Sequence, residues 1–281
     1  MILNSTVEFW NHPDMPYVET RRACQSRICY KSHSHPTFSI GAVDAGQSHF
    51  SSSFASEQLI QAGSVVVIPA HVEHSCNPLP QQAWSYQMIH LDAAWLAGLI
   101  NELQQEIDSH LDLNIPYLPQ LKPIILHDLD IYAAFTGLNQ VLFDPQIPRL
   151  EKEQYLIKTL TEMLIPNFHW ENIGAAGYFQ PYLPRLIECL NSSMDDLSLQ
   201  QLADELQMSR YALIRLFKHY LGLTPHAYQL NQKVNQARLR LRQGCDLAQL
   251  AYELEFTDQS HFHRVFKQYT GVTPKQYSKK S

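Results

Sequence analysis

The sequence predicts an α+β protein: an N-terminal β-barrel with following helices, then an all-α C-terminal domain of two helix-turn-helix units joined by a long helix. Three observations predict this architecture. Short apolar runs separated by Gly, Pro, Ser and Asn fill residues 17–92, as in barrels and jelly rolls. Apolar residues at helical spacing dominate from residue 93 onward. One helical segment is written twice, at residues 202–228 and 250–277, which indicates a duplicated unit.

The expected barrel has its clearest strand candidates at residues 27–30, 37–43 and 64–68. Residues 84–90 also alternate like a strand, so the side chains of Tyr86, Met88 and His90 share one face. We expect these three side chains to line the barrel interior or to pack directly beneath it.

Three helical stripes follow between residues 93 and 179, and prolines separate the segments. Their apolar faces can either cover the barrel or form a contact between two copies of the chain. Residues 174–177, Gly-Ala-Ala-Gly, are the best hinge. The 281 residues therefore divide into an N-terminal domain at 1–177 and a C-terminal domain at 178–281.

Each copy of the repeat carries the start and stop signals of two helices joined by a turn. Ser209 in the first copy, and Thr257 or Asp258 in the second, can cap the N-terminus of the second helix. Gly222 and Gly271 suit the left-handed position that ends it. These are helix-turn-helix units.

Residues 225–242, between the two copies, predict a single helix about 27 Å long, at 1.5 Å per residue. Thr224 and Pro225 supply its N-cap and first residue. The expected outer face is basic and consists of Lys233, Arg238, Arg240 and Arg242. A rod of this length can hold two recognition helices near the spacing of successive major grooves, about 34 Å.

The second helix of each unit is the one that enters the major groove in helix-turn-helix proteins. Its polar face offers Arg210, Tyr211, Ile214, Arg215 and Lys218 in the first copy, and Gln259, Ser260, His263, Arg264 and Lys267 in the second. Arginine can bind guanine with two hydrogen bonds and glutamine can bind adenine, while Ser and Tyr hold phosphates. Arg215 and Arg264 recur at equivalent repeat positions, which favours contact with DNA over two solvated surface charges.

The charge distribution agrees with a basic domain attached to an acidic one. Residues 178–281 hold 13 Lys+Arg and 9 Asp+Glu, a net charge of +4, whereas residues 1–177 hold 8 and 18, a net charge of −10. The overall charge of −6 argues weakly against nucleic-acid binding, but contact with phosphates needs only local positive charge.

The sequence also bears on the cellular compartment. No apolar run is long enough to cross a bilayer, and the N-terminus lacks the pattern of a secretory signal. The five cysteines form no C-x-x-C pair and are expected to be reduced thiols: Cys24, Cys29, Cys76, Cys189 and Cys245. We expect a cytoplasmic protein without a membrane partner.

The last hundred residues resemble the AraC/XylS-type bacterial transcription regulators. The matching positions are Ala203, Arg215, Phe217, Gly222, Pro225, Ala237, Leu241, Ala251, Phe256, Phe262, Arg264, Phe266, Lys267, Gly271 and Pro274. The resemblance implies base contacts from Tyr211, Ile214 and Arg215 in one groove, and from Gln259, Ser260, His263 and Arg264 in the next. Ile214 departs from the polar residue often found there, which suggests contact with a thymine methyl group or no base contact. The resemblance also implies a double-stranded DNA operator, RNA polymerase and a second copy of the chain as partners, and it favours activation.

Two half-motifs sharpen the barrel prediction. They consist of His33, His35, Ser39 and Gly46, and then of Gly63, Pro69, His74 and Asn77. Together they resemble the two motifs of the cupin fold, a small β-barrel that AraC-type regulators often place before the DNA-binding domain. Cupin motifs supply two histidines, a glutamate and a later histidine to a metal, and Ser39 stands here at the glutamate position.

Three imidazoles at His33, His35 and His74 can still bind zinc, nickel or iron. Without the carboxylate we expect no metal cofactor, and instead a pocket in which imidazoles and hydroxyls, Ser39 included, bind a polar small-molecule effector. A purely structural role of the histidines remains the alternative. If the effector is an amino acid, Glu19 can hold its amine and Arg21 its carboxylate, unless the two form an exposed ion pair worth little.

The sequence therefore predicts a ligand-responsive transcription regulator rather than an enzyme. The pocket residues are Glu19, Arg21, His33, His35, Ser39, His74, Tyr86, Met88 and His90. Two alternatives stay open: a metal-dependent cupin enzyme fused to a DNA-binding domain, and a constitutive DNA-binding regulator with an empty barrel.

Overall fold

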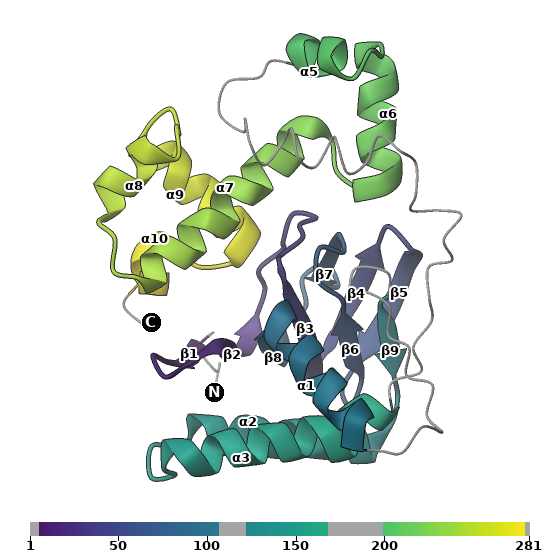
Figure 1. The fold of residues 1–281 in the computed structure, drawn as a ribbon, viewed down its shortest axis with the longest axis vertical. Coiled ribbons are helices and arrows are strands. Elements are labelled where there is room, and N and C mark those ends of the chain that lie inside the picture. The colour runs from purple at the N-terminus through teal and green to yellow at the C-terminus, as the bar shows by residue number, and fades with distance from the viewer. Residues whose placement is uncertain (1–5, 107–121, 168–198, 279–281) are drawn as a thin grey trace.

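The computed structural model describes residues 6–106, 122–167 and 199–278 (Figure 1). The N-terminal part is rich in strands with a layer of helices beside them, and the C-terminal part is entirely helical. The predicted α+β architecture is confirmed. The predicted domain boundary at residues 174–177 lies outside the described residues and stays a prediction.

The strands of the N-terminal domain form two antiparallel sheets. The strands are β1 (Thr6–His12), β2 (Met15–Ser26), β3 (Thr37–Ala45), β4 (Gln47–Ser52), β5 (Ala55–Gln61), β6 (Val65–Ile68), β7 (His74–Pro78), β8 (Trp84–Asp92) and β9 (Ile124–Leu126). One sheet has the order β1-β2-β8-β3-β6-β9 and the other β5-β4-β7. Strand β8 lies centrally, between β2 and β3.

The two faces of β8 pack into different apolar clusters, because successive side chains along a strand point to opposite faces. Ile89 and Leu91 pack into the apolar core shared with the helices. Tyr86 and Met88 face the other way and pack with residues of the second sheet, such as Phe50 and Ile60. The predicted pairing of even-numbered side chains on one face is therefore confirmed.

Helices cover the outer face of the six-stranded sheet (Figure 1). They are α1 (Ala93–Glu106), α2 (Leu129–Phe143) and α3 (Arg149–Lys158), with a π-helical turn η2 (Thr159–Leu164) and a short 3-10 turn η3 (Ile165–Asn167) after α3. Phe135, Leu138 and Leu156 are fully buried against the sheet. Of the two expected uses of these apolar faces, covering the barrel is thus observed.

The helical domain consists of two small units around a central rod (Figure 1). Its helices are α5 (Leu199–Glu205), α6 (Arg210–Leu221), α7 (Pro225–Arg242), α8 (Leu247–Glu253), α9 (Gln259–Thr270) and α10 (Pro274–Ser278). Helix α7 has the predicted bounds, and its first and second halves pack into separate apolar clusters. Each unit therefore has its own small core.

The predicted helix signals are confirmed. Ser209 accepts a hydrogen bond from the backbone N–H of Ala212, and Asp258 from that of His261, so each recognition helix is capped by its side chain. Gly222 and Gly271 end these helices with φ values of 68° and 78°, in the left-handed region that favours glycine.

Two sequence expectations are wrong. Residues 27–30 are not a strand, because Tyr30 exchanges both backbone hydrogen bonds with the side chain of Asn77, at 2.6 and 3.2 Å, and not with a neighbouring strand. The face of α7 that carries Arg238 and Arg242 does not point into solvent; it packs against the N-terminal domain, where both side chains meet Glu19.

Candidate functional site

A cavity of about 50 Å³ lies where the N-terminal domain meets the helical domain. Strands β2, β7 and β8 and the segment before β3 supply one wall, and α7, α9 and α10 supply the other. Eight of the nine expected pocket residues line it: Glu19, Arg21, His33, His35, His74, Tyr86, Met88 and His90. The ninth, Ser39, lies one layer behind, next to His90.

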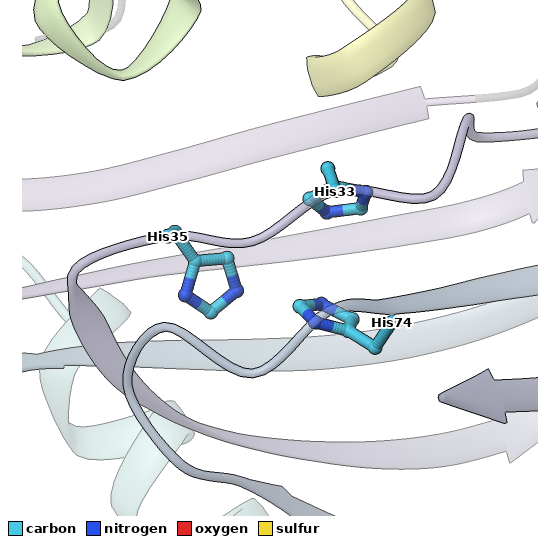
Figure 2. A group of neighbouring side chains, drawn as sticks. All are labelled: His33, His35 and His74. Carbon is cyan, nitrogen blue, oxygen red and sulfur yellow. The ribbon is translucent and has the colours of Figure 1, made fainter. Parts of the chain in front are cut away.

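Three histidines in this cavity form what we call the three-histidine site (Figure 2). Their ligand nitrogens, one each from His33, His35 and His74, all lie within 4.8 Å of one another. Backbone hydrogen bonds of 3.0 and 2.9 Å join His33 to His74 in both directions. The segment before β3 and the start of β7 are therefore fixed side by side.

The same type of hydrogen bond orients all three rings. Nδ1 of His33 lies 2.7 Å from the carbonyl of Lys31, Nδ1 of His35 lies 3.0 Å from that of Thr37, and Nδ1 of His74 lies 2.9 Å from that of Val72. A carbonyl can only accept, so each neutral ring carries its proton on Nδ1 and leaves the lone pair of Nε2 free.

A fourth imidazole, His90, lies beside this group, with its ring centroid 4.9 Å from that of His35. Its Nδ1 is 2.7 Å from the hydroxyl of Ser39, its partner across the β3–β8 ladder. Ser39, at the position where the cupin resemblance implies a carboxylate, thus orients another histidine.

Burial keeps these histidines neutral. It lowers the pKa of His74 to about 4, and it lowers the pKa of His33, His35 and His90 well below the usual value. The positive charges of Arg21 and Arg238 lower the pKa values of these buried rings further. Neutral imidazoles with a carbonyl behind each ring are the form that binds a metal ion, so the residues present fit one.

Glu19 is buried, only 3 % exposed, and joins the two domains. Its carboxylate lies 3.2 Å from Arg238 and 3.5 Å from Arg242, both on α7, and accepts a hydrogen bond of 2.8 Å from the hydroxyl of Tyr277 on α10. The carboxylate of Glu19 is thus neutralised by arginines of the helical domain. The sequence alternative of an exposed ion pair between Glu19 and Arg21 is not observed.

Arg21 points from the same strand into the cavity and also reaches the helical domain. It donates to the carbonyl of Thr270 at 3.0 Å and to the hydroxyl of Tyr86 at 2.7 Å. Burial raises the pKa of Tyr86, so the phenol stays protonated. The Nε of Arg21 is buried and has no hydrogen-bond partner among the described residues.

A second contact ties α7 to the loop between two of the histidines. Asn231 is buried; its side chain accepts from the backbone N–H of Ser34 at 3.2 Å and donates to the carbonyl of Ser34 at 2.9 Å. Asn235 donates to the same carbonyl at 3.0 Å. Ser34 is the residue between His33 and His35.

Sequence reasoning missed the wall that the helical domain supplies. Arg238, Tyr269, Thr270 and Tyr277 line the cavity together with Tyr30 of the barrel. Tyr269 and Tyr277 have counterparts in the first repeat, Tyr220 and Tyr228, a pattern that fits residues of the core of each unit equally well. No periodicity marks a residue that lines a pocket in another domain, so no signal in the sequence was available.

The expected DNA-contact residues lie on α6 and α9, mostly exposed. Tyr211 is 70 % exposed, and Ile214 and Arg215 are exposed beside it, with the guanidinium of Arg215 over the Tyr211 ring. Arg210, Lys218, Gln259, Ser260, Arg264 and Lys267 are also exposed, and His263 is half-buried. Within the described residues neither Arg215 nor Arg264 forms an ion pair. Lys218 differs, since its Nζ donates to the carbonyl of Gly222 at 2.6 Å.

Two family models match the chain. The model described as an AraC-like ligand binding domain matches residues 15–140, and the one described as a helix-turn-helix domain matches residues 202–280. Together they cover more than two thirds of the chain. The described residues contain no helix that is both long and apolar enough to cross a membrane.

Several known proteins are similar along the chain. The HTH-type transcriptional regulator YbfI of Bacillus subtilis is 24 % identical over 233 residues, 83 % of this chain and 81 % of that protein. The transcriptional activator RhaS of Escherichia coli is 25 % identical over 186 residues, 64 % of this chain and 63 % of its own. The crystal structure of ToxT from Vibrio cholerae has a TM-score of 0.55 at 14 % identity, covering 98 % of this chain and 97 % of that one, and so shares the fold.

The barrel and the pair of helix-turn-helix units therefore match the two domains of one class of transcription regulator. The chain belongs to the AraC family of transcription regulators, with a ligand-binding domain followed by a DNA-binding domain.

Proposed function

We propose that the protein is a ligand-responsive, sequence-specific activator of transcription in the cytoplasm, and not an enzyme, and that its cavity senses a small polar metabolite. One observation carries this proposal: the cavity is bounded by the ligand-binding domain on one side and by α7, α9 and α10 of the DNA-binding domain on the other. A ligand there contacts both domains and so can favour one arrangement of them over another.

The size of the cavity supports this coupling. A volume of about 50 Å³ has room for about three or four ordered waters, at roughly 15 Å³ each. A larger ligand, such as an amino acid, must displace Arg238, Tyr269 or Tyr277 from the mouth. Binding of such a ligand would therefore move the DNA-binding domain away from the barrel.

Individual polar groups of the lining favour a ligand that forms hydrogen bonds. The cavity offers histidine Nε2 atoms as acceptors, and the buried donors Arg21 Nε and Trp84 Nε1, which have no partner among the described residues. A ligand with both donors and acceptors, such as an amino acid or a sugar, would satisfy these groups. One solved ToxT structure holds an unsaturated fatty acid; the imidazoles and guanidinium groups here favour a smaller and more polar molecule.

For the DNA contact, we propose that α6 and α9 enter successive major grooves of an operator. Bases would be contacted by Tyr211, Ile214, Arg215, Gln259, Ser260, His263 and Arg264, and phosphates by Arg210, Lys218 and Lys267. The exposure of these side chains supports this assignment. RNA polymerase is a further proposed partner, since the RhaS relative is named an activator. A second copy of the chain is proposed on the family resemblance alone.

Binding to the operator, identified by selection from random duplexes, tests the DNA contact. Arg215→Ala and Arg264→Ala should each weaken operator binding by about 1–3 kcal/mol and relax base preference at the contacted positions. Arg149→Ala, which removes an exposed arginine from α3 of the other domain, is the matched control and should leave binding unchanged. Equal losses on operator and random duplexes would contradict base contact by these arginines.

A thermal-shift screen with amino acids and sugars tests the effector. A true ligand raises the unfolding midpoint of the wild type by mass action and loses this effect in His74→Gln. If no compound raises the unfolding midpoint, and operator affinity is the same with and without each compound, the alternative of a constitutive regulator with an empty barrel is correct. If metal-loaded protein turns over a substrate, the enzyme alternative is correct.

A further inference from the structure

The three-histidine site has the ligand arrangement of a metal centre with open coordination positions. Three imidazoles converge, and a carbonyl hydrogen bond fixes the ring and the proton of each, which is the usual support of a metal-bound histidine. Because backbone hydrogen bonds join His33 and His74, little ordering is left for a metal to impose. Three protein ligands leave a fourth position for water or another ligand.

The charge of the cavity determines what an ion does there. Two guanidinium groups, Arg21 and Arg238, line it together with the histidines, and Glu19 is the one carboxylate among the lining residues. Glu19 also pairs with Arg242 from outside the cavity. A dication therefore enters a space that already has more positive than negative charge, and it repels Arg238 of the DNA-binding domain.

We propose that the three-histidine site binds a divalent transition-metal ion of the zinc and nickel class, and that this ion opposes docking of the DNA-binding domain through Arg238. The inference rests on the proposed function, since it assigns a ligand to the same cavity. Coupling between two binding events is reciprocal. The docked domain therefore weakens metal binding by the same factor as the metal weakens docking.

A direct connection supports this coupling. Ser34, between two of the ligands, is held by Asn231 and Asn235 of α7. Any shift of the segment from His33 to His35 on metal binding therefore reaches the helix that joins the two helix-turn-helix units.

Co²⁺ is a suitable probe, because its visible d–d absorption reports coordination by imidazole directly. Full-length protein freed of metal by a chelator should take up one Co²⁺ per chain. His33→Gln and His74→Gln should each lower the affinity by at least about tenfold, while His49→Gln, a barrel histidine that pairs with Glu57 elsewhere, should not. Equal Co²⁺ affinities in all four proteins would overturn the metal site. Circular dichroism checks the folding of each variant; if one misfolds, paramagnetic shifts of the imidazole protons in the wild type identify the ligands.

The coupling has its own test. Arg238→Met should raise the Co²⁺ affinity by at least roughly tenfold, because it removes a positive charge close to the ion, and such a charge repels a dication strongly even at an effective dielectric constant near 20. Arg240→Met is the matched control, because Arg240 lies on the same helix but pairs with Glu253 at 2.7 Å, away from the cavity. An unchanged affinity in Arg238→Met would refute the coupling. Protein that binds its operator but no Co²⁺ refutes this inference alone, whereas protein that binds Co²⁺ but prefers no duplex refutes the proposed function alone.

Discussion

Replacing Glu19 with Gln tests whether the domain contact depends on one buried carboxylate. The change keeps the shape of the side chain and removes its charge. Arg238 and Arg242 then face each other's charge without compensation, and their side chains are only 19 % and 27 % exposed. Because all the partners of Glu19 at this site lie on α7 and α10, the loss should fall on the docking of the two domains and not on the fold of either one.

The expected size follows from the burial of the pair. Removing one partner of a fully buried ion pair costs about 3–5 kcal/mol. Here both arginines can regain water when the domains separate, so we expect about 2–3 kcal/mol, the low end of that range or slightly below. At 1.4 kcal/mol per factor of ten, the undocked state should become roughly 30- to 150-fold more populated.

Amide hydrogen exchange can measure this change residue by residue. The backbone N–H of Lys31 donates to the carbonyl of Gln268 at 3.1 Å, and that of Ser34 donates to Asn231 at 3.2 Å, so both amides are protected only while the domains are docked. The N–H of His33 donates within the barrel, to His74, and is the internal control. We expect Glu19→Gln to expose Lys31 and Ser34 and to leave His33 protected.

The matched control variant is Glu253→Gln, which breaks the half-exposed pair with Arg240 on the same rod and should change docking by less than about 1 kcal/mol. Unchanged protection of Lys31 in Glu19→Gln would refute the reasoning. So would an equal loss at His33, because it would mean that the barrel itself unfolds.

Three further outcomes are expected. Gly271→Ala should destabilise the protein more than Gly244→Ala in thermal unfolding. Both glycines have φ near +80°, but a Cβ at 271 would lie 2.6 Å from the Tyr30 hydroxyl, whereas one at 244 meets nothing within 4 Å. Equal effects would show that Tyr30 moves away at no cost. Stability should fall as the pH drops from about 6.5 toward 4, because the pKa of His74 is about 4 when folded and 6.5 when exposed. The unfolded chain then binds more protons in this window, and His74→Gln should reduce the slope by up to about 1.4 kcal/mol per pH unit; an unchanged slope would mean that His74 titrates normally. Ser209→Ala should cost about 1 kcal/mol through loss of the cap on α6, measured by denaturant unfolding, and a cost near zero would mean that water replaces the hydroxyl.

The helical domain could be predicted almost in full because its signals are local. A cap such as Ser209, a stop such as Gly222 and the apolar stripe between them all act within one or two turns. The repeat doubled each signal, and α7 has the predicted bounds. The common face of Tyr86, Met88 and His90 was predictable for the same reason, since alternation is a property of a single strand.

The meeting of the two domains could not be predicted, because it depends on residues about 200 or more positions apart. Nothing near Glu19 in the sequence indicates Arg238, 219 positions away. A basic residue on a helix is most often solvated, so the face with Arg238 and Arg242 was assigned to solvent. The strand prediction for residues 27–30 was wrong for a related reason. Their apolar pattern resembles a strand, but the backbone N–H and carbonyl of Tyr30 bond to the side chain of the distant Asn77.

The amide of Asn231 has one more consequence. It binds both the N–H of Ser34 and its carbonyl. A change in the cavity can therefore reach α7 through this contact, without passing along the covalent connection between the two domains. A chain connected in this way should tolerate extra residues inserted between its two domains and still respond to its ligand. Loss of the Asn231 carboxamide should weaken that response, while Asn235 and the contacts of Glu19 with α7 remain.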